Sequence, residues 1–306
     1  MQKTKFKYED LANMLSKDKL IIFLFHGVIN KHKDSVRNYS SKHLEKDFFA
    51  NAIKLLSKKG NSLSMDDVKN HIENKMRFPK YSYSITFDDG FENNISIAAP
   101  ILYEYKTFAT IYITTKFVEN NLMSWIDRIE NAVQNYSEVK FNWFGDNFSL
   151  NTTEKKINFL EKIRYVVKND FTINPDEYAD KICFKLGESI YSQDNHLDLK
   201  MNWNQVKSAN NSEYLSIGGH SHSHKILSFL SKNDLKEEIN LSIDLLKSKA
   251  NINPIHYSYP EGMANCFNEN VINELKMRGI KCCPTAIRGY NRNDTSLFHL
   301  NRVQVF

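Results

Sequence analysis

Cysteine is scarce in this chain, and its placement argues against two common uses of the residue. The 306 residues include four cysteines: Cys183, Cys266, Cys282 and Cys283. Their spacing matches neither a zinc cluster nor a redox motif, and sequence neighbours rarely pair with each other. We therefore expect reduced, buried or incidental thiols, as in a cytosolic protein.

No apolar run is long enough to cross a membrane. The run at residues 20–25 is short, lacks a small-residue cleavage site and leads directly into His26. We interpret it as a strand that places His26 at the mouth of a barrel, where it either contacts a ligand or bonds to backbone. We expect no integral membrane segment. Because no export signal is evident, we predict a cytoplasmic location and leave peripheral membrane attachment open.

Basic stripes and glycine-rich phosphate loops are also missing. The net charge is +5 and the isoelectric point about 8.8, yet lysines and acids intermingle along the chain. We therefore expect no nucleic-acid partner. A chain of this length with 41% hydrophobic residues can bury a sizeable core.

The alternation of predicted elements is typical of an α/β fold with a parallel sheet. Residues 42–59 and 232–250 have helical apolar spacing, and Gly60 ends the first of these helices. Residues 85–87 and 107–114 are predicted strands. Further elements are expected as follows: a strand leading to a capped short helix over 61–67, a helix over 95–106 bent or restarted at Pro100, and strand-like segments at 214–217 and within 277–286 and 298–305.

Residues 125–200 have a different, charged and Asn-rich pattern with helical periodicity. We predict a largely helical insertion within a single domain of residues 1–306, which either covers the barrel mouth or lies on an outer face. Trp125 opens this segment. Its indole either stacks on a ligand or packs in a core.

Two adjacent carboxylates, Asp88 and Asp89, end the strand-like run at residues 85–87 and are followed by Gly90. Parallel α/β sheets build their sites at the carboxyl ends of strands. Two carboxylates at one place suggest that one binds a cation and the other moves a proton. Asp-Asp-Gly is also ordinary turn chemistry, so the motif needs a partner elsewhere in the chain.

A histidine-rich segment, residues 218–224, supplies that partner. His220 and His224 are four residues apart, so in helical or turn geometry both imidazoles can bind one metal. His222 then points elsewhere. Asp89 is available as the third ligand, and a set of two histidines and one carboxylate leaves positions open for water and substrate. Adventitious metal binding or a solvated loop is the alternative.

At these two motifs the chain resembles the polysaccharide deacetylases of the NodB-homology type, carbohydrate esterase family 4. Residues 86–90 are similar to the family's first motif and residues 220–224 to its second. The resemblance implies a distorted (β/α) barrel, Asp88 as the general base, and Zn²⁺ or another divalent transition metal. It assigns three metal ligands: Asp89, His220 and His224.

A weaker match concerns the family's Arg-x-Pro-Tyr segment. Residues 258–262 are similar to a Tyr-Pro-x-Gly version found in a branch associated with surface-polysaccharide synthesis. The resemblance implies that the backbone N–H of Glu261 helps to bind the oxyanion. Ser258 stands where the family has an arginine that orients the base. Arg302, near the end of the chain, either orients Asp88 instead or pairs with a surface acid.

The general acid stays open, because the family's late Leu-x-His motif has no clear counterpart. The candidates are three histidines: His299, His222 and His26. The candidates for substrate contact are His26, Trp125 and Tyr259.

The function implied by the resemblance is hydrolysis of an N-acetyl group from an amino sugar of a surface polysaccharide or its precursor. The partner would be an N-acetylated sugar or glycan, and the sequence does not indicate an oligomeric state. Two alternatives stay open: a hydrolase of the same fold acting on another amide such as an N-formyl group, and a non-catalytic, metal-containing glycan-binding relative. The substitutions at Ser258 and Glu261 favour the binding-only alternative, whereas the intact Asp88 argues against it.

Overall fold

The computed structural model describes residues 6–31, 36–136, 141–143, 145–187 and 196–306. The chain divides into two compact units. The first comprises Met1–Asn30, His43–Leu122 and Lys200–Phe306, and the second comprises Lys31–Lys42 and Met123–Leu199. The insertion expected over residues 125–200 corresponds in sequence to most of the second unit, which also includes the separate stretch at residues 31–42.

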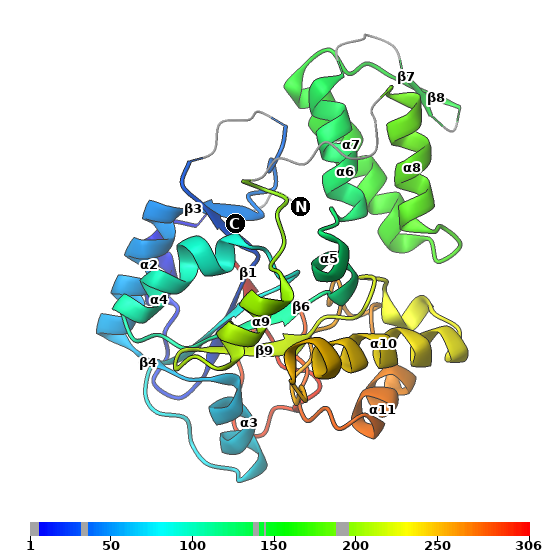
Figure 1. Cartoon of the computed structure of the whole chain (residues 1–306). Helices are drawn as coiled ribbons and strands as arrows, with labels where there is room; N and C mark the ends of the chain where they lie inside the picture. Colours follow the sequence, from blue (N-terminus) through cyan, green and yellow to red (C-terminus); the bar gives the residue numbers. More distant parts are fainter. Residues whose placement is uncertain (1–5, 32–35, 137–140, 144, 188–195) are drawn as a thin grey trace. The chain divides into compact units, whose positions relative to one another are not determined.

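A parallel sheet forms the centre of the first unit (Figure 1). The strand order is β10-β1-β5-β6-β9, with β4 beside β5. The strand bounds are Ile21–Phe25 (β1), Asn61–Ser62 (β4), Ser82–Phe87 (β5), Ala109–Ile113 (β6), Leu215–Gly219 (β9) and Val303–Gln304 (β10). Every residue of β1, β5 and β6 is buried, as expected for parallel strands covered on both faces.

Isolated parallel bridges continue the pairing beyond β9. They join Gly219 to Tyr257, His256 to Cys282, and Pro284 to Leu300. Leu300 lies just before β10, which pairs with β1. The pairing thus returns to its start, and the predicted α/β class with a distorted barrel is confirmed. The strand-like segment expected within residues 277–286 consists only of these isolated bridges.

Helices surround this sheet in the first unit (Figure 1). They are α1 (Tyr8–Asn13), α2 (Lys46–Lys59), α3 (Met65–Glu73), α4 (Ala99–Glu104), α5 (Thr115–Asn120), α9 (Trp203–Asn210), α10 (Lys232–Ala250) and α11 (Glu269–Met277), with the single turns η1 (Asn94–Ala98) and η2 (Leu227–Phe229). Helix α10 has the predicted bounds. Helix α2 begins later than predicted, because residues 43–45 pair as β3 (His43–Glu45) with β2 (Gly27–Ile29). The helix expected over 95–106 starts as the π-helical turn η1 and continues as α4, with Pro100 in its first turn.

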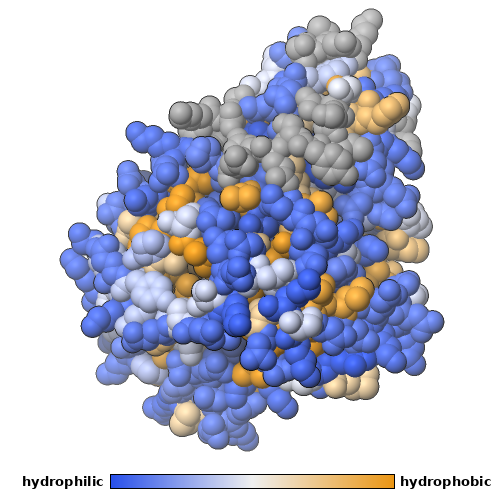
Figure 2. Space-filling view, in the orientation of Figure 1, coloured by the Kyte–Doolittle hydropathy of each residue, from blue (hydrophilic) through white to orange (hydrophobic). Residues whose placement is uncertain are grey.

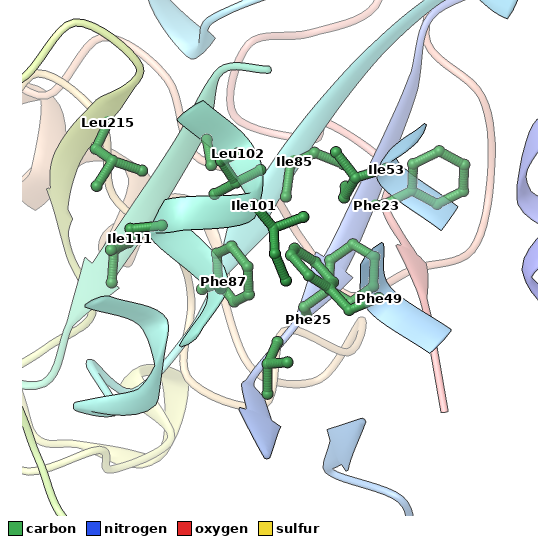
Figure 3. Packing of buried hydrophobic residues seen from close by; sticks show 14 of the residues in the cluster. Phe23, Phe25, Phe49, Ile53, Ile85, Phe87, Ile101, Leu102, Ile111 and Leu215 are labelled. Atoms are coloured by element: carbon green, nitrogen blue, oxygen red, sulfur yellow. The ribbon is translucent and has the colours of Figure 1, made fainter. Parts of the chain in front are cut away.

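Three phenylalanines at the centre of the core hold β1 and β5 against α2 (Figure 3). The rings of Phe25 and Phe87 lie 5.7 Å apart, and Phe49 of α2 contacts them at 5.4 and 5.8 Å. All three are almost completely buried, and each such burial contributes about 1.5–3 kcal/mol. The cluster thereby fixes the carboxyl ends of the two strands, which directly precede His26 and Asp88.

The second unit has a separate, mainly helical core. Its elements are α6 (Trp125–Asn135), α7 (Thr153–Asn169), α8 (Pro175–Lys185) and the antiparallel pair β7 (Phe141–Trp143) and β8 (Asp146–Phe148). The short antiparallel pair was not predicted from the sequence. Two ion pairs, the buried Arg37 with Asp198 and the half-buried Arg164 with buried Glu130, tie residues 36–42 and α7 to the same unit.

No helix within the described ranges is long and apolar enough to span a membrane. Hydrophilic residues cover most of the face seen in Figure 2, and apolar residues appear there in small separate groups.

All four cysteines are buried as free thiols. Burial raises the pKa of the Cys282 and Cys283 thiols, so both stay protonated near neutral pH.

Candidate metal centre and active site

Asp88 and Asp89 follow β5 directly, at the carboxyl ends of the parallel strands. The N–H of Asp88 donates to the carbonyl of Phe25 (3.1 Å), which extends the β1–β5 pairing to this point. Asp89 and Gly90 then have φ angles of 74° and 72°, the left-handed region that glycine tolerates best. The chain therefore turns sharply after Asp88, and the two carboxylates acquire different partners.

The histidine loop, residues 220–224, follows β9. The N–H of His220 donates to the carbonyl of Ile113 (2.9 Å), so β6 supports the start of the loop. Ser221 and His224 have φ angles of 64° and 60°, and the Ser221 Oγ accepts from the N–H of His224 (2.8 Å). Turn geometry, rather than a helix, thus brings the His220 and His224 rings to 4.9 Å.

Asp89, His220 and His224 converge on one point. A ligand atom of each residue lies within 4.8 Å of the other two. The Asp89 Oδ1 is 3.6 Å from the His220 Nε2 and 3.3 Å from the His224 Nε2. Among the described residues, this is the group of three side chains that could hold a metal ion, and it is the set that the sequence motifs single out.

Neighbouring groups orient both histidines for metal binding. The His220 Nδ1 lies 2.9 Å from the Ser258 carbonyl oxygen; since a carbonyl only accepts, Nδ1 carries the hydrogen and Nε2 keeps its lone pair. The His224 ring stacks on Phe117 with centroids 6.0 Å apart. Burial lowers the pKa of His220, which favours the neutral imidazole that metals bind. The donor set therefore fits a divalent transition metal of the zinc type.

Asp88 forms a bidentate ion pair with Arg302. The Arg302 Nη1 lies 2.8 Å from the Asp88 Oδ1, and Nη2 lies 2.9 Å from Oδ2. Arg302 is fully buried, and its Nε donates to the Thr285 carbonyl (2.6 Å). Because the planar guanidinium is anchored at its other edge, the pair holds the Asp88 carboxylate in one orientation.

Ser258 joins this ion pair. Its Oγ accepts from the Arg302 Nη2 (2.9 Å) and donates to the Asp88 Oδ2 (3.3 Å). From the sequence, Ser258 is only the position of a lost arginine and has no predicted role. The structure shows that a small hydroxyl at this position leaves room for a guanidinium arriving from a different strand and bonds to it.

Burial and charge act in opposite directions on Asp88. Burial raises the pKa of its carboxyl, but the charge of Arg302, followed by those of His220 and His26, outweighs burial and holds the pKa below its usual value. Asp88 is therefore ionised near neutral pH and able to accept a proton.

His26 lies at the end of β1, beside the end of β5. The Asn94 Nδ2 donates to its carbonyl (2.7 Å), and the Asn93 Oδ1 accepts from the N–H of Val28 (3.1 Å). Consecutive asparagines at the start of η1 thus hold the backbone on both sides of Gly27. Because Phe25 pairs with Phe87, His26 follows β1 at the level where Asp88 follows β5, and the His26 charge helps to lower the pKa of Asp88.

Glu261 occupies a tight turn. Its φ is 60° and that of Gly262 is 62°. The N–H of Gly262 donates to the Pro260 carbonyl (2.7 Å), and its own carbonyl accepts from Ala286 (2.8 Å). These bonds hold the backbone at the position where the resemblance implies an oxyanion donor.

Two aromatic residues proposed as substrate contacts lie in hydrophobic cores. Trp125 is buried in the core of the second unit, which is the alternative that the sequence left open. Tyr259 is completely buried; its hydroxyl donates to the Phe298 carbonyl (3.1 Å) and its ring stacks on Phe267 (4.3 Å). With no exposed surface, the Tyr259 side chain is not accessible to a substrate.

His299 and His222 also lie apart from the metal-ligand group. The exposed His299 contacts the Ser296 hydroxyl (3.0 Å) and the Phe267 ring. The His222 Nδ1 lies 3.0 Å from the Thr115 Oγ, and the residue lines a polar cavity of about 380 Å³ with side chains of α10. Of the three histidines considered as general acid, His26 is therefore the one placed beside Asp88.

Comparisons with known proteins agree with this fold. The family model described as polysaccharide deacetylase matches residues 178–283. No curated protein sequence matches the chain.

Several solved structures are similar over nearly the whole chain. The Streptococcus pyogenes deacetylase PplD, in complex with acetate, has 16% identity and a TM-score of 0.60, covering 95% of this chain and 94% of that chain. IcaB from Ammonifex degensii has 14% identity and a TM-score of 0.61, with the same coverage. A de-N-acetylase from Aggregatibacter actinomycetemcomitans has 13% identity and a TM-score of 0.59, covering 94% and 95%. At these identities the likeness shows a shared fold. Residues 178–283 thus match the polysaccharide deacetylase family model, and the chain shares the fold of these deacetylases.

Proposed function

We propose that the protein hydrolyses the N-acetyl group of an amino sugar in a surface polysaccharide or its precursor. One observation carries the proposal: two adjacent carboxylates have different partners. Asp89 faces two imidazole nitrogens, whereas Asp88 is held by Arg302. The first arrangement suits cation binding and the second suits proton transfer, the pair of tasks that metal-assisted amide hydrolysis requires.

The metal would be Zn²⁺ or another divalent transition ion held by Asp89, His220 and His224. When bound, such an ion polarises the amide carbonyl and lowers the pKa of a water molecule. Three protein ligands leave coordination positions for water and substrate, as in catalytic rather than structural sites.

Asp88 acts as the general base in this proposal. Its carboxylate is ionised, fixed by Arg302 and adjacent in sequence to the ligand Asp89. It takes the proton of the water that attacks the carbonyl carbon, and Arg302 and Ser258 keep it aligned meanwhile. The backbone N–H of Glu261 donates to the oxyanion that forms, and a backbone donor is unaffected by the glutamate at this position.

His26 is our proposed proton donor to the leaving amine. An amide nitrogen leaves poorly unless it is protonated, so a second acid is required. His26 follows β1 at the level of Asp88, Asn94 bonds to its carbonyl, and Asn93 bonds to the N–H of the nearby Val28. His222 and His299 have other partners, as described above.

Replacing His26 by glutamine should lower kcat by about 10², the lower end of the usual contribution of a positioned acid. The alkaline limb of the kcat–pH profile should disappear, because no proton donor is then left to titrate. The matched control is His299→Gln, which should leave both kcat and the profile unchanged. A normal alkaline limb in His26→Gln would contradict the assignment.

The substrate class is tested by measuring acetate release from three kinds of compound: N-acetylated sugar nucleotides, lipid-linked sugars and oligosaccharides. We expect acetate from at least one of them. Formate release from N-formyl sugars without acetate release would favour the other amide, and glycan binding without turnover would favour a binding-only relative. The PplD structure, with acetate bound, supports testing acetyl substrates first.

The cytoplasmic location and the single-domain organisation remain predictions. The location prediction rests on the free thiols, and fractionation of expressing cells tests it. Oligomeric state is open and is measurable by light scattering.

A further inference from the structure

Glu238 lies outside all of the motifs discussed above, yet it contacts the histidine loop directly. Its Oε1 accepts from the Ser223 backbone N–H, and its Oε2 accepts from the Ser223 hydroxyl (2.8 Å). Ser223 immediately precedes His224. One carboxylate from α10 thus receives both hydrogen-bond donors of a residue inside the loop that carries two proposed ligands.

Helix α10 gives Glu238 a fixed position. The buried residues of the helix follow helical spacing along one face: Leu235, Glu238, Ile239, Ser242, Leu246 and Ala250. The Ser231 Oγ caps the helix by accepting from the Asp234 N–H (3.3 Å). A carboxylate on a buried stripe is unfavourable unless it is hydrogen-bonded. Ser223 satisfies both oxygens of Glu238.

The histidine loop needs such support because its backbone conformation is intrinsically disfavoured. Ser221 and His224 have φ angles of 64° and 60°, and neither is glycine, so the surroundings must hold them there. Within the loop, the Ser221 Oγ supplies one bond to His224. Glu238 supplies two more from outside the loop.

We propose that Glu238 is a positioning residue that keeps residues 220–224 in the conformation that presents His220 and His224 to a metal. The inference rests on the metal site of the proposed function. Glu238 acts through hydrogen bonds to Ser223 and not as a ligand. A loop already ordered loses less conformational freedom on binding, so loss of these acceptors should weaken metal affinity.

The test is the zinc affinity of metal-free protein, measured by competition with a chromophoric chelator. Glu238→Ala should bind zinc about 10- to 100-fold more weakly than wild type. Glu238→Gln should bind near the wild-type level, because its amide oxygen can accept from the Ser223 N–H and its NH₂ can donate to the Ser223 Oγ. The matched control is Glu237→Ala, the exposed neighbour on the same helix, which should be unchanged.

The outcomes separate this inference from the proposed function. If wild type binds no zinc, the proposed metal site and the role of Glu238 both fail. If wild type binds zinc and folded Glu238→Ala binds it equally, only the role of Glu238 fails. Thermal unfolding of the metal-free proteins establishes that each variant is folded. Should Glu238→Ala not fold, Ser223→Ala removes the hydroxyl donor alone; about tenfold weaker zinc binding would support the role, and unchanged binding would overturn it.

Discussion

Asp88→Asn should retain the metal and lose roughly 10²–10⁴ in kcat, the usual contribution of a positioned base. Asparagine has nearly the same shape and still offers Arg302 an oxygen, but it cannot accept a proton from water. The ligand group of Asp89, His220 and His224 is not altered. Zinc content and deacetylation rate measured on the same preparation test both halves of the expectation, with the exposed Asp244→Asn as a matched control.

Alanine at Asp89, His220 or His224 should weaken zinc binding, whereas Asp88→Asn should leave it intact. Each change removes a proposed ligand, so zinc affinity should fall by at least about 100-fold, beyond the usual effect of losing an outer partner. His299→Ala removes an exposed histidine and should bind zinc normally. Full zinc occupancy in His220→Ala would show that the ligand set is wrong.

Arg302→Met should shift the acidic limb of the pH–rate profile to higher pH. Arg302 opposes burial at Asp88 and keeps the pKa of the carboxyl low; without that charge, burial dominates and the pKa rises. Asp88 is then protonated, and inactive as a base, at a pH where the wild type still works. Zinc should stay bound, because Arg302 contacts none of the proposed ligands among its described hydrogen bonds.

The same change should destabilise the fold at neutral pH. Breaking a buried ion pair by removing one partner typically costs about 3–5 kcal/mol. Since the folded-state pKa of Asp88 is depressed, the pair stabilises the wild type above the unfolded-state pKa. That contribution is lost as the pH falls through the folded-state pKa, so the difference between wild type and variant should shrink in acid. Denaturant titrations at several pH values measure this.

Two further arginine variants sharpen the test. Arg302→Lys should rescue only partly, because a point charge cannot reproduce the bidentate fork. Arg278→Met removes an arginine from an exposed pair with Glu274 and should change stability by less than about 1 kcal/mol. An unshifted acidic limb in Arg302→Met would leave Asp88 without an assigned partner.

The spacing of apolar residues in the sequence predicted the helices and strands in which that spacing is regular. The helix at residues 232–250 and the strands that precede Asp88 and His220 were predicted from apolar spacing, and the α/β class follows from their alternation. Weak or very short elements were missed, including β3, β7, β8 and α11. The three strands contain too few residues to show a period, and tertiary pairing decides their conformation.

For the candidate site too, some features were predictable from the sequence and others depended on the tertiary structure. The sequence by itself determined which residues are adjacent to strand ends, and therefore that Asp88, Asp89 and the histidine loop could meet at one edge of a parallel sheet. The sequence left open the partner of Arg302 and the surroundings of Trp125. It also led to the prediction that Tyr259 contacts the substrate. Only the tertiary structure decided these, because β10 lies beside β1 and so brings Arg302 to Asp88, while Trp125 and Tyr259 are buried among apolar residues distant in sequence. Contacts between such distant segments depend on how the strands are ordered, which no local pattern records.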